Sequence, residues 1–151
     1  MGKKFLVAVD GSEQGWKAAE LAVTLAKTSD AELILLHVVP EEPVPEGFEQ
    51  WAEVEGVSPS DMRARYRASR SYGDVIIRDA EARARKSGLE RVTSKVAEGN
   101  ASAEIVGFAK AVGADMVFLG SRGLSDARGL LVGSVSHRVL HLAPCTCVLV
   151  K

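Results

Sequence analysis

The segment from Gly120 to Ser136 combines glycines, hydroxyls and arginines in a way that suits phosphate binding. Gly120 and Gly123 lack a Cβ atom, so the backbone beside them can approach a ligand closely. Gly133 and Ser134 open a stretch of helical periodicity, and the free amides and dipole at a helix start favour an anion. The segment also supplies positively charged and hydroxyl side chains, at Arg122, Arg128, Ser134 and Ser136.

Two common phosphate-binding loops do not describe this segment. It has no Gly-Lys-Ser/Thr end, which a P-loop requires. The dinucleotide fingerprint G-x-G-x-x-G would have to follow the first strand, and it does not occur there. From the residues alone, the glycines could simply form a turn, and Ser134 could be only the N-cap of a helix.

Two histidines and two cysteines have spacings that invite a metal-binding interpretation. His137 and His141 lie four apart on a predicted helix, but Arg138 stands where the H-E-x-x-H motif has glutamate. Cys145 and Cys147 would project from the same face of a strand, where a disulfide is unfavourable. We expect a structural or surface role for the histidines, small buried apolar side chains at the cysteines, and no metal site built by the protein.

Strands and helices alternate along the chain. Apolar runs predict strands at 4–9, 32–39, 89–97, 115–120 and 145–150, and helical periodicity predicts helices at 12–29, 60–87, 99–113 and 133–142. Gly73 marks a possible interruption of the second helix. This alternation predicts a Rossmann-like α/β fold, an open five-stranded parallel sheet of order 3-2-1-4-5 with helices on both faces.

This topology predicts where a ligand would bind. In open parallel sheets the site lies beyond the carboxyl ends of the strands, where the strand order reverses. Here the reversal falls between the first and fourth strands, whose carboxyl ends carry Asp10 and Gly120. From the residues alone, Asp10 could instead cap the first helix.

Composition excludes several classes of protein. The chain has 151 residues, suited to one domain, and a net charge of −1 that argues against a polyanion binder. Four Phe, two Trp and two Tyr are too few to suggest platforms for stacking nucleic-acid bases. No apolar run is long enough for a signal peptide or a membrane span, so we expect a cytoplasmic protein without a membrane partner. An acidic stretch at about 40–60 is expected to be a loop or lid.

The chain resembles the universal stress protein family over nearly its whole length, outside 40–60. The resemblance rests on Gly120-x-x-Gly123 followed after nine residues by Gly133-Ser134, and on the segments 7–12, 37–38, 113–115 and 143–145. It implies that residues 1–151 form a single universal stress protein domain of the ATP-binding subgroup.

The resemblance also implies a role for each site residue. Asp10 would bind the ribose, and the Val38 backbone, with Ala8 nearby, would recognise adenine. The phosphates would be lined by Gly120, Arg122, Gly123, Gly133, Ser134 and Ser136. Mg or Mn would be held through the phosphates of ATP.

The function implied is that of an ATP-binding regulatory or stress-adaptation protein with at most slow ATP hydrolysis. Asp126 is the nearest candidate for a general base, and a loop aspartate is more often a turn former. Two alternatives stay open: a metal-dependent nucleotide hydrolase or transferase, and a ligand-free dimeric interaction module. The resemblance also implies a homodimer paired through the last strand, where Thr146 and Cys147 depart from the family pattern, and a protein partner that the sequence does not identify.

Overall fold

A computed structural model describes residues 2–40, 53–54, 56, 59–121 and 133–151. Its strands are β1 (Lys4–Ala8), β2 (Glu32–Val39), β3 (Val92–Glu98), β4 (Met116–Gly120) and β5 (Thr146–Val150). Its helices are α1 (Glu13–Ser29), α3 (Pro59–Lys86), α4 (Ala101–Val112) and α5 (Ser134–Leu142). Most of the acidic stretch 40–60 lies outside the described residues, as do Arg122, Gly123, Asp126 and Arg128.

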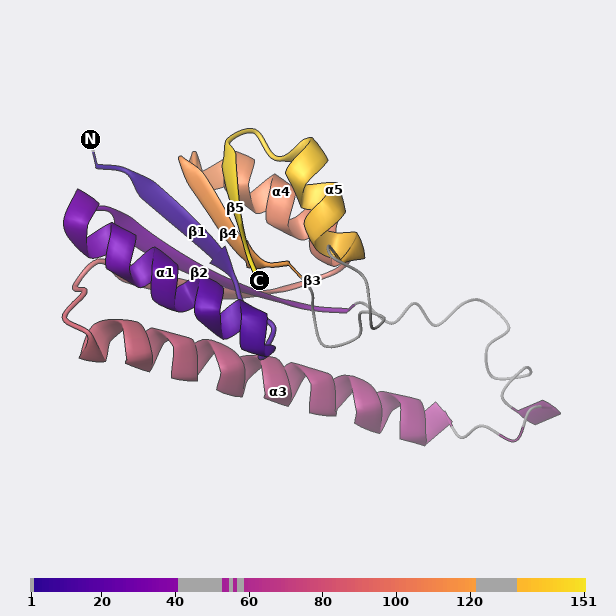
Figure 1. The fold of residues 1–151 in the computed structure, drawn as a ribbon. Coiled ribbons are helices and arrows are strands. Elements are labelled where there is room, and N and C mark those ends of the chain that lie inside the picture. The colour runs from indigo at the N-terminus through magenta and orange to yellow at the C-terminus, as the bar shows by residue number, and fades with distance from the viewer. Residues whose placement is uncertain (1, 41–52, 55, 57–58, 122–132) are drawn as a thin grey trace.

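The strands form one parallel sheet of order β3-β2-β1-β4-β5, which confirms the predicted topology (Figure 1). In the register, Leu6 of β1 lies beside Ile34 of β2 and Val117 of β4. These side chains are apolar because central parallel strands are covered on both faces. The reversal of strand order therefore falls between β1 and β4.

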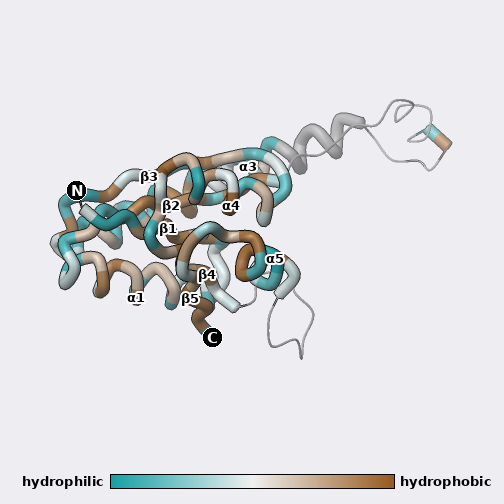
Figure 2. The backbone as a smooth tube through the Cα atoms, turned by 90° about the horizontal axis from the view of Figure 1, so that it is seen from above, coloured by the Kyte–Doolittle hydropathy of each residue, from teal (hydrophilic) through white to brown (hydrophobic). Residues whose placement is uncertain are grey.

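Helices cover both faces of the sheet, as predicted (Figure 1). Helices α1 and α3 pack over one face, where Phe5 and Phe118 meet with ring centroids 5.4 Å apart. Helices α4 and α5 pack over the other face through Ile105, Ala109 and Val139. Hydrophobic and hydrophilic residues alternate along α1 and α3, as expected for helices with one buried side (Figure 2).

Apart from shifts of one or two residues at the ends of elements, two predictions differ from the structure. Helix α3 continues through Gly73 without interruption. Glycine at this position lets α3 pack closely against β2, because a Cβ at Gly73 would lie 2.7 Å from Cδ2 of His37. Strand β3 begins at Val92 rather than at residue 89, because Gly88 has a φ of +95° and the Leu89 amide donates to the Ala84 carbonyl, which ends the helix.

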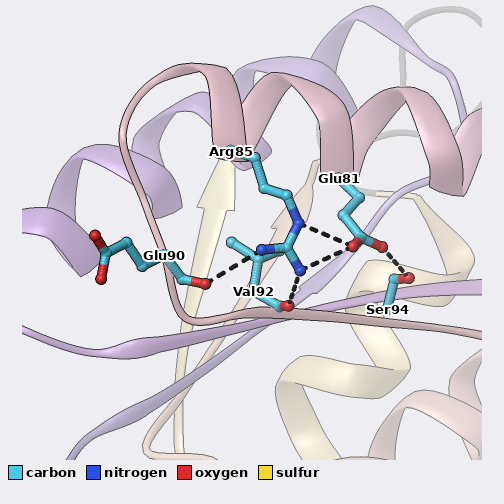
Figure 3. A network of polar contacts seen from close by, with 5 residues as sticks. All are labelled: Glu81, Arg85, Glu90, Val92 and Ser94. Carbon is cyan, nitrogen blue, oxygen red and sulfur yellow. Dashed lines mark hydrogen bonds and ion pairs between the residues drawn. The ribbon is translucent and has the colours of Figure 1, made fainter.

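A polar network joins the end of α3 to the start of β3 (Figure 3). The Arg85 guanidinium donates to Glu81 Oε1 at 3.0 Å and to the carbonyls of Glu90 and Val92 at 3.2 and 2.8 Å. The Ser94 hydroxyl donates to Glu81 Oε2 at 2.6 Å. The network therefore fastens the edge strand β3 to α3 at the amino end of the sheet.

Across the described part of the chain, every helix is too short or too polar to cross a bilayer.

Candidate functional site

A cavity of about 560 Å³ opens at the carboxyl ends of β1 and β4. Ligand sites commonly have volumes of about 300–1,000 Å³. Its floor is mainly aliphatic, with Ala8, Leu36, Val38, Ile105 and Leu119 among the lining residues. Polar groups enter from the β1–α1 turn, from α3 and from the start of α5. The cavity lies where the topology places a ligand site.

Six of the nine residues predicted for the site line this cavity: Ala8, Asp10, Val38, Gly120, Ser134 and Ser136. Gly133 is buried, and its amide donates to the Ser121 carbonyl at 2.6 Å, so this N–H already has a partner. Arg122 and Gly123 lie outside the described residues. A role for these nine residues in binding a nucleotide stays a prediction.

The carboxylate of Asp10 is held in place by the turn that follows β1. Its Oδ1 accepts from the Ser12 amide at 2.9 Å and from the Ser12 hydroxyl at 2.5 Å. The Ser12 hydroxyl in turn accepts from the Gly15 amide at 3.0 Å. Ser12 is therefore the N-cap of α1, and Asp10 orients that cap rather than serving as it. Within the described residues, Asp10 Oδ2 has no hydrogen bond, and Asp10 lines the cavity.

Two side chains fix the backbone beside Asp10. His37 Nδ1 donates to the Val9 carbonyl at 2.7 Å, and the Tyr72 hydroxyl donates to the Asp10 carbonyl at 3.1 Å. His37 also lines the cavity. The sequence analysis did not identify Tyr72. The one signal close to it was Gly73, the next residue, which was interpreted as a possible interruption of the helix.

The start of α5 differs from the starts of α1 and α4. The side chains of Ser12 and Asn100 accept from amides in the first turns of α1 and α4, whereas the N-cap of α5 is Gly133, which has no side chain. Among the described residues, no group accepts a hydrogen bond from the amides of Ser134 to Ser136. Ser134 is thus the first helical residue and not the cap.

Two other predicted ligand groups have partners inside the protein. The Ser136 hydroxyl donates to the Gly120 carbonyl at 2.7 Å, which ties α5 to the end of β4. A Cβ at Gly120 would lie 2.8 Å from the backbone of Gln14 and Gly15. The sequence analysis assigned the small size of Gly120 to ligand approach, which stays a prediction; the structure shows that it also allows α1 to pack closely against β4.

The histidines and cysteines do not form a metal-binding cluster within the described residues. The rings of His137 and His141 meet edge to face, with centroids 4.6 Å apart, on the exposed side of α5. Cys145 and Cys147 are free, half-buried and packed against the core. Burial raises the pKa of both thiols, which favours the protonated, apolar form.

Comparison with known proteins identifies the family of this chain. The profile of the Universal stress protein family matches residues 1–151. The chain belongs to the universal stress protein family. Universal stress protein YxiE of Bacillus subtilis is 34% identical to it, with 100% of both chains covered.

Solved structures of universal stress proteins share the fold. Universal stress protein UspA from Lactobacillus plantarum superposes with a TM-score of 0.80 at 22% identity, covering 99% of this chain and 97% of that one. A universal stress protein in complex with cAMP has a TM-score of 0.71 at 24% identity, with 99% and 97% covered. The universal stress protein from Archaeoglobus fulgidus in complex with dAMP has a TM-score of 0.69 at 18% identity, with 100% and 98% covered.

Proposed function

We propose that this universal stress protein binds an adenine nucleotide, ATP, in the cavity at the carboxyl ends of β1 and β4, and acts as a nucleotide-responsive regulator. The observation that carries the proposal is the start of α5, which has no side-chain cap among the described residues and opens into the same cavity as Asp10. A helix start without a side-chain cap leaves amides that an anion can satisfy. Complexes of two family members with cAMP and dAMP support the adenine nucleotide class.

The cavity offers a different chemistry to each part of ATP. The amides of α5 and the exposed Ser134 hydroxyl suit the phosphates. The Asp10 Oδ2, which has no hydrogen bond with the part of the chain that the structure describes, suits the hydroxyls of the ribose. The aliphatic floor around Val38, Ile105 and Leu119 suits the flat, largely apolar base.

A divalent metal belongs to this proposal through the nucleotide. Mg²⁺ usually keeps several waters and binds substrate phosphates rather than an all-protein cage, and Mn²⁺ accepts similar oxygen ligands. The metal would neutralise phosphate charge at the start of α5. Hydrolysis, if it occurs, is proposed to be slow, because Asp10 is the one carboxylate among the described cavity-lining residues and it is assigned to the ribose.

A charge placed at the first position of α5 tests the phosphate assignment. Ser134→Asp should leave the fold intact or slightly more stable, by about 0.3–1 kcal/mol, because an acid is favourable in the first turn of a helix. The same charge should repel the phosphates and weaken Mg-ATP binding at least about tenfold in calorimetric titrations, which corresponds to about 1.4 kcal/mol. Adenosine binding should change little.

Ser134→Ala serves as the matched control, because it removes the hydroxyl and adds no charge. Mass spectrometry of ligand released from freshly purified wild-type protein provides a second, independent measurement. The proposal fails if the wild type carries no adenine nucleotide and shows no heat of binding with Mg-ATP. Equal weakening of ATP and adenosine by Ser134→Asp would show that α5 does not face the phosphates.

We also propose a homodimer paired through β5. Strand β5 is at the edge of the sheet, so one side of its backbone has no partner strand among the described residues. Sedimentation equilibrium should then give a mass of twice 16.1 kDa. A mass of one chain at micromolar concentration would contradict the proposal.

A further inference from the structure

Helix α3 places an aromatic ring in the wall of the cavity. Its cavity-lining residues are Ala68, Ser69 and Tyr72. Among the described lining residues, only Tyr72 and His37 are aromatic, and the others offer aliphatic, hydroxyl, carboxylate or backbone groups.

The Tyr72 ring is held in place without being buried. Its hydroxyl donates to the Asp10 carbonyl at 3.1 Å. Its ring packs edge to face with His37, with centroids 6.2 Å apart and an interplanar angle of 71°. His37 is itself fixed by the bond from its Nδ1 to the Val9 carbonyl. Tyr72 nevertheless keeps 43% of its surface exposed.

Two glycines allow α3 to come this close to the turn after β1. Gly11 has a φ of +85°, and a Cβ there would lie 2.1 Å from the Tyr72 hydroxyl oxygen. Gly73, the next residue of α3, lies against His37 in the same way. Side chains at these two positions would displace the ring from the cavity wall.

Helix packing alone explains the hydroxyl bond and the two glycines. It does not explain why a large ring, fixed at its hydroxyl and against the His37 ring, stays 43% exposed in the wall of a mainly aliphatic cavity. A rigid aromatic face beside such a cavity is suited to a flat π-system, because aromatic rings and bases attract each other by stacking.

We propose that Tyr72 stacks against the base of the bound nucleotide, so that α3 selects ligands that carry an aromatic base. This inference rests on the proposed nucleotide-binding function and adds a residue to that site. In the resulting arrangement, α5 holds the phosphates, Asp10 holds the ribose and Tyr72 covers the base.

Calorimetric titration of two probes, Mg-ATP and inorganic tripolyphosphate, tests the assignment. Tyr72→Leu should weaken Mg-ATP binding by about 5- to 150-fold, the range measured for loss of one base–aromatic stack. Binding of tripolyphosphate, which has no base, should stay unchanged. Tyr72→Phe keeps the ring and should bind Mg-ATP nearly as the wild type does.

Val75→Ala is the matched control on the same helix, because Val75 is 60% exposed and does not line the cavity. Wild-type affinity for Mg-ATP in Tyr72→Leu would overturn the stacking role, as would an equal loss of ATP and tripolyphosphate binding. If Tyr72→Leu does not fold, nuclear Overhauser effects between the Tyr72 ring and adenine H2 or H8 in the wild type decide the question, and their absence overturns the proposal. Failure of the wild type to bind Mg-ATP would instead overturn the proposed function, and this inference with it.

Discussion

The two ends of the parallel sheet differ in how fully the described residues pair their polar groups. At the amino end, polar side chains fasten loops: the Lys4 amide donates to Asp115 Oδ2 at 2.7 Å, and Lys27 Nζ donates to the Ser87 carbonyl at 2.6 Å. A smaller cavity of about 310 Å³ lies there, and the Arg91–Asp30 ion pair joins two of its lining residues.

At the carboxyl end, the described residues satisfy only part of the polar groups. Asp10 uses one carboxylate oxygen for Ser12, and α5 begins without a side-chain cap. The amino end closes its loops with charged side chains, whereas at the carboxyl end the described residues leave Asp10 Oδ2 and the first amides of α5 unpaired beside an apolar floor. We therefore expect stability and the proposed nucleotide binding to depend on different ends of the same strands.

Two aspartates at opposite ends of the sheet make this comparison testable. Asp10→Asn should lower the affinity for both ATP and adenosine by about tenfold, because a charge-assisted bond to the ribose is replaced by a neutral one. The free energy of unfolding should change by less than about 1 kcal/mol, since Asn Oδ1 can still accept from Ser12. Calorimetric titration and urea unfolding measure the two effects.

Asp115→Asn is the matched variant at the amino end. It weakens the bond from the Lys4 amide and should cost about 0.5–1.5 kcal/mol of unfolding free energy, with ATP affinity unchanged. If Asp115→Asn lowered affinity as much as Asp10→Asn, or if Asp10→Asn changed stability alone, the division between the two ends would be wrong.

The sequence predicted the strand order and both helical layers because apolar runs and helical periodicity extend over whole elements. It also located Asp10 and Gly120, because the topology brings the ends of β1 and β4 together. These signals depend on local sequence patterns and on topology, so they can be interpreted without knowing how the side chains pack.

Tyr72 could not be found in this way. A helix of 28 residues has many turns, and the pattern along it does not show which turn reaches the carboxyl end of the sheet. The packing role of Gly120 was missed for a related reason, because the backbone of Gln14 and Gly15 approaches it only after folding. Contacts between elements distant in sequence thus decided the details of the site.

The smallest expected effect concerns the Arg85 network at the amino end of the sheet, whose contribution to stability should depend on pH. Hydrogen bonds from Ser94 and then Arg85 lower the pKa of Glu81, and the charge of Arg85 adds to this while partial burial opposes it. Because the pKa of Glu81 is lower in the folded protein than in the unfolded chain, ionised Glu81 stabilises the fold. This contribution is complete above the ordinary glutamate pKa of about 4.3 and is lost as the pH falls through the lower folded-state pKa. Both side chains are partly exposed, so we expect only about 0.5–1 kcal/mol at pH 7.

Urea unfolding of the wild type and Glu81→Gln at pH 7, 5 and 3 measures this contribution. The wild type should be more stable at pH 7, and the difference should shrink toward pH 3 as Glu81 takes up a proton. Ser94→Ala removes the largest cause of the lowered pKa and should reduce the pH dependence in the same direction. ATP affinity at pH 7 should be the same in all three proteins, because the network lies at the amino end of the sheet. If the free energy of unfolding depends on pH in the same way in the wild type and in Glu81→Gln, the network does not stabilise the fold through this carboxylate. A change in ATP affinity in either variant would show that the two ends of the sheet are coupled.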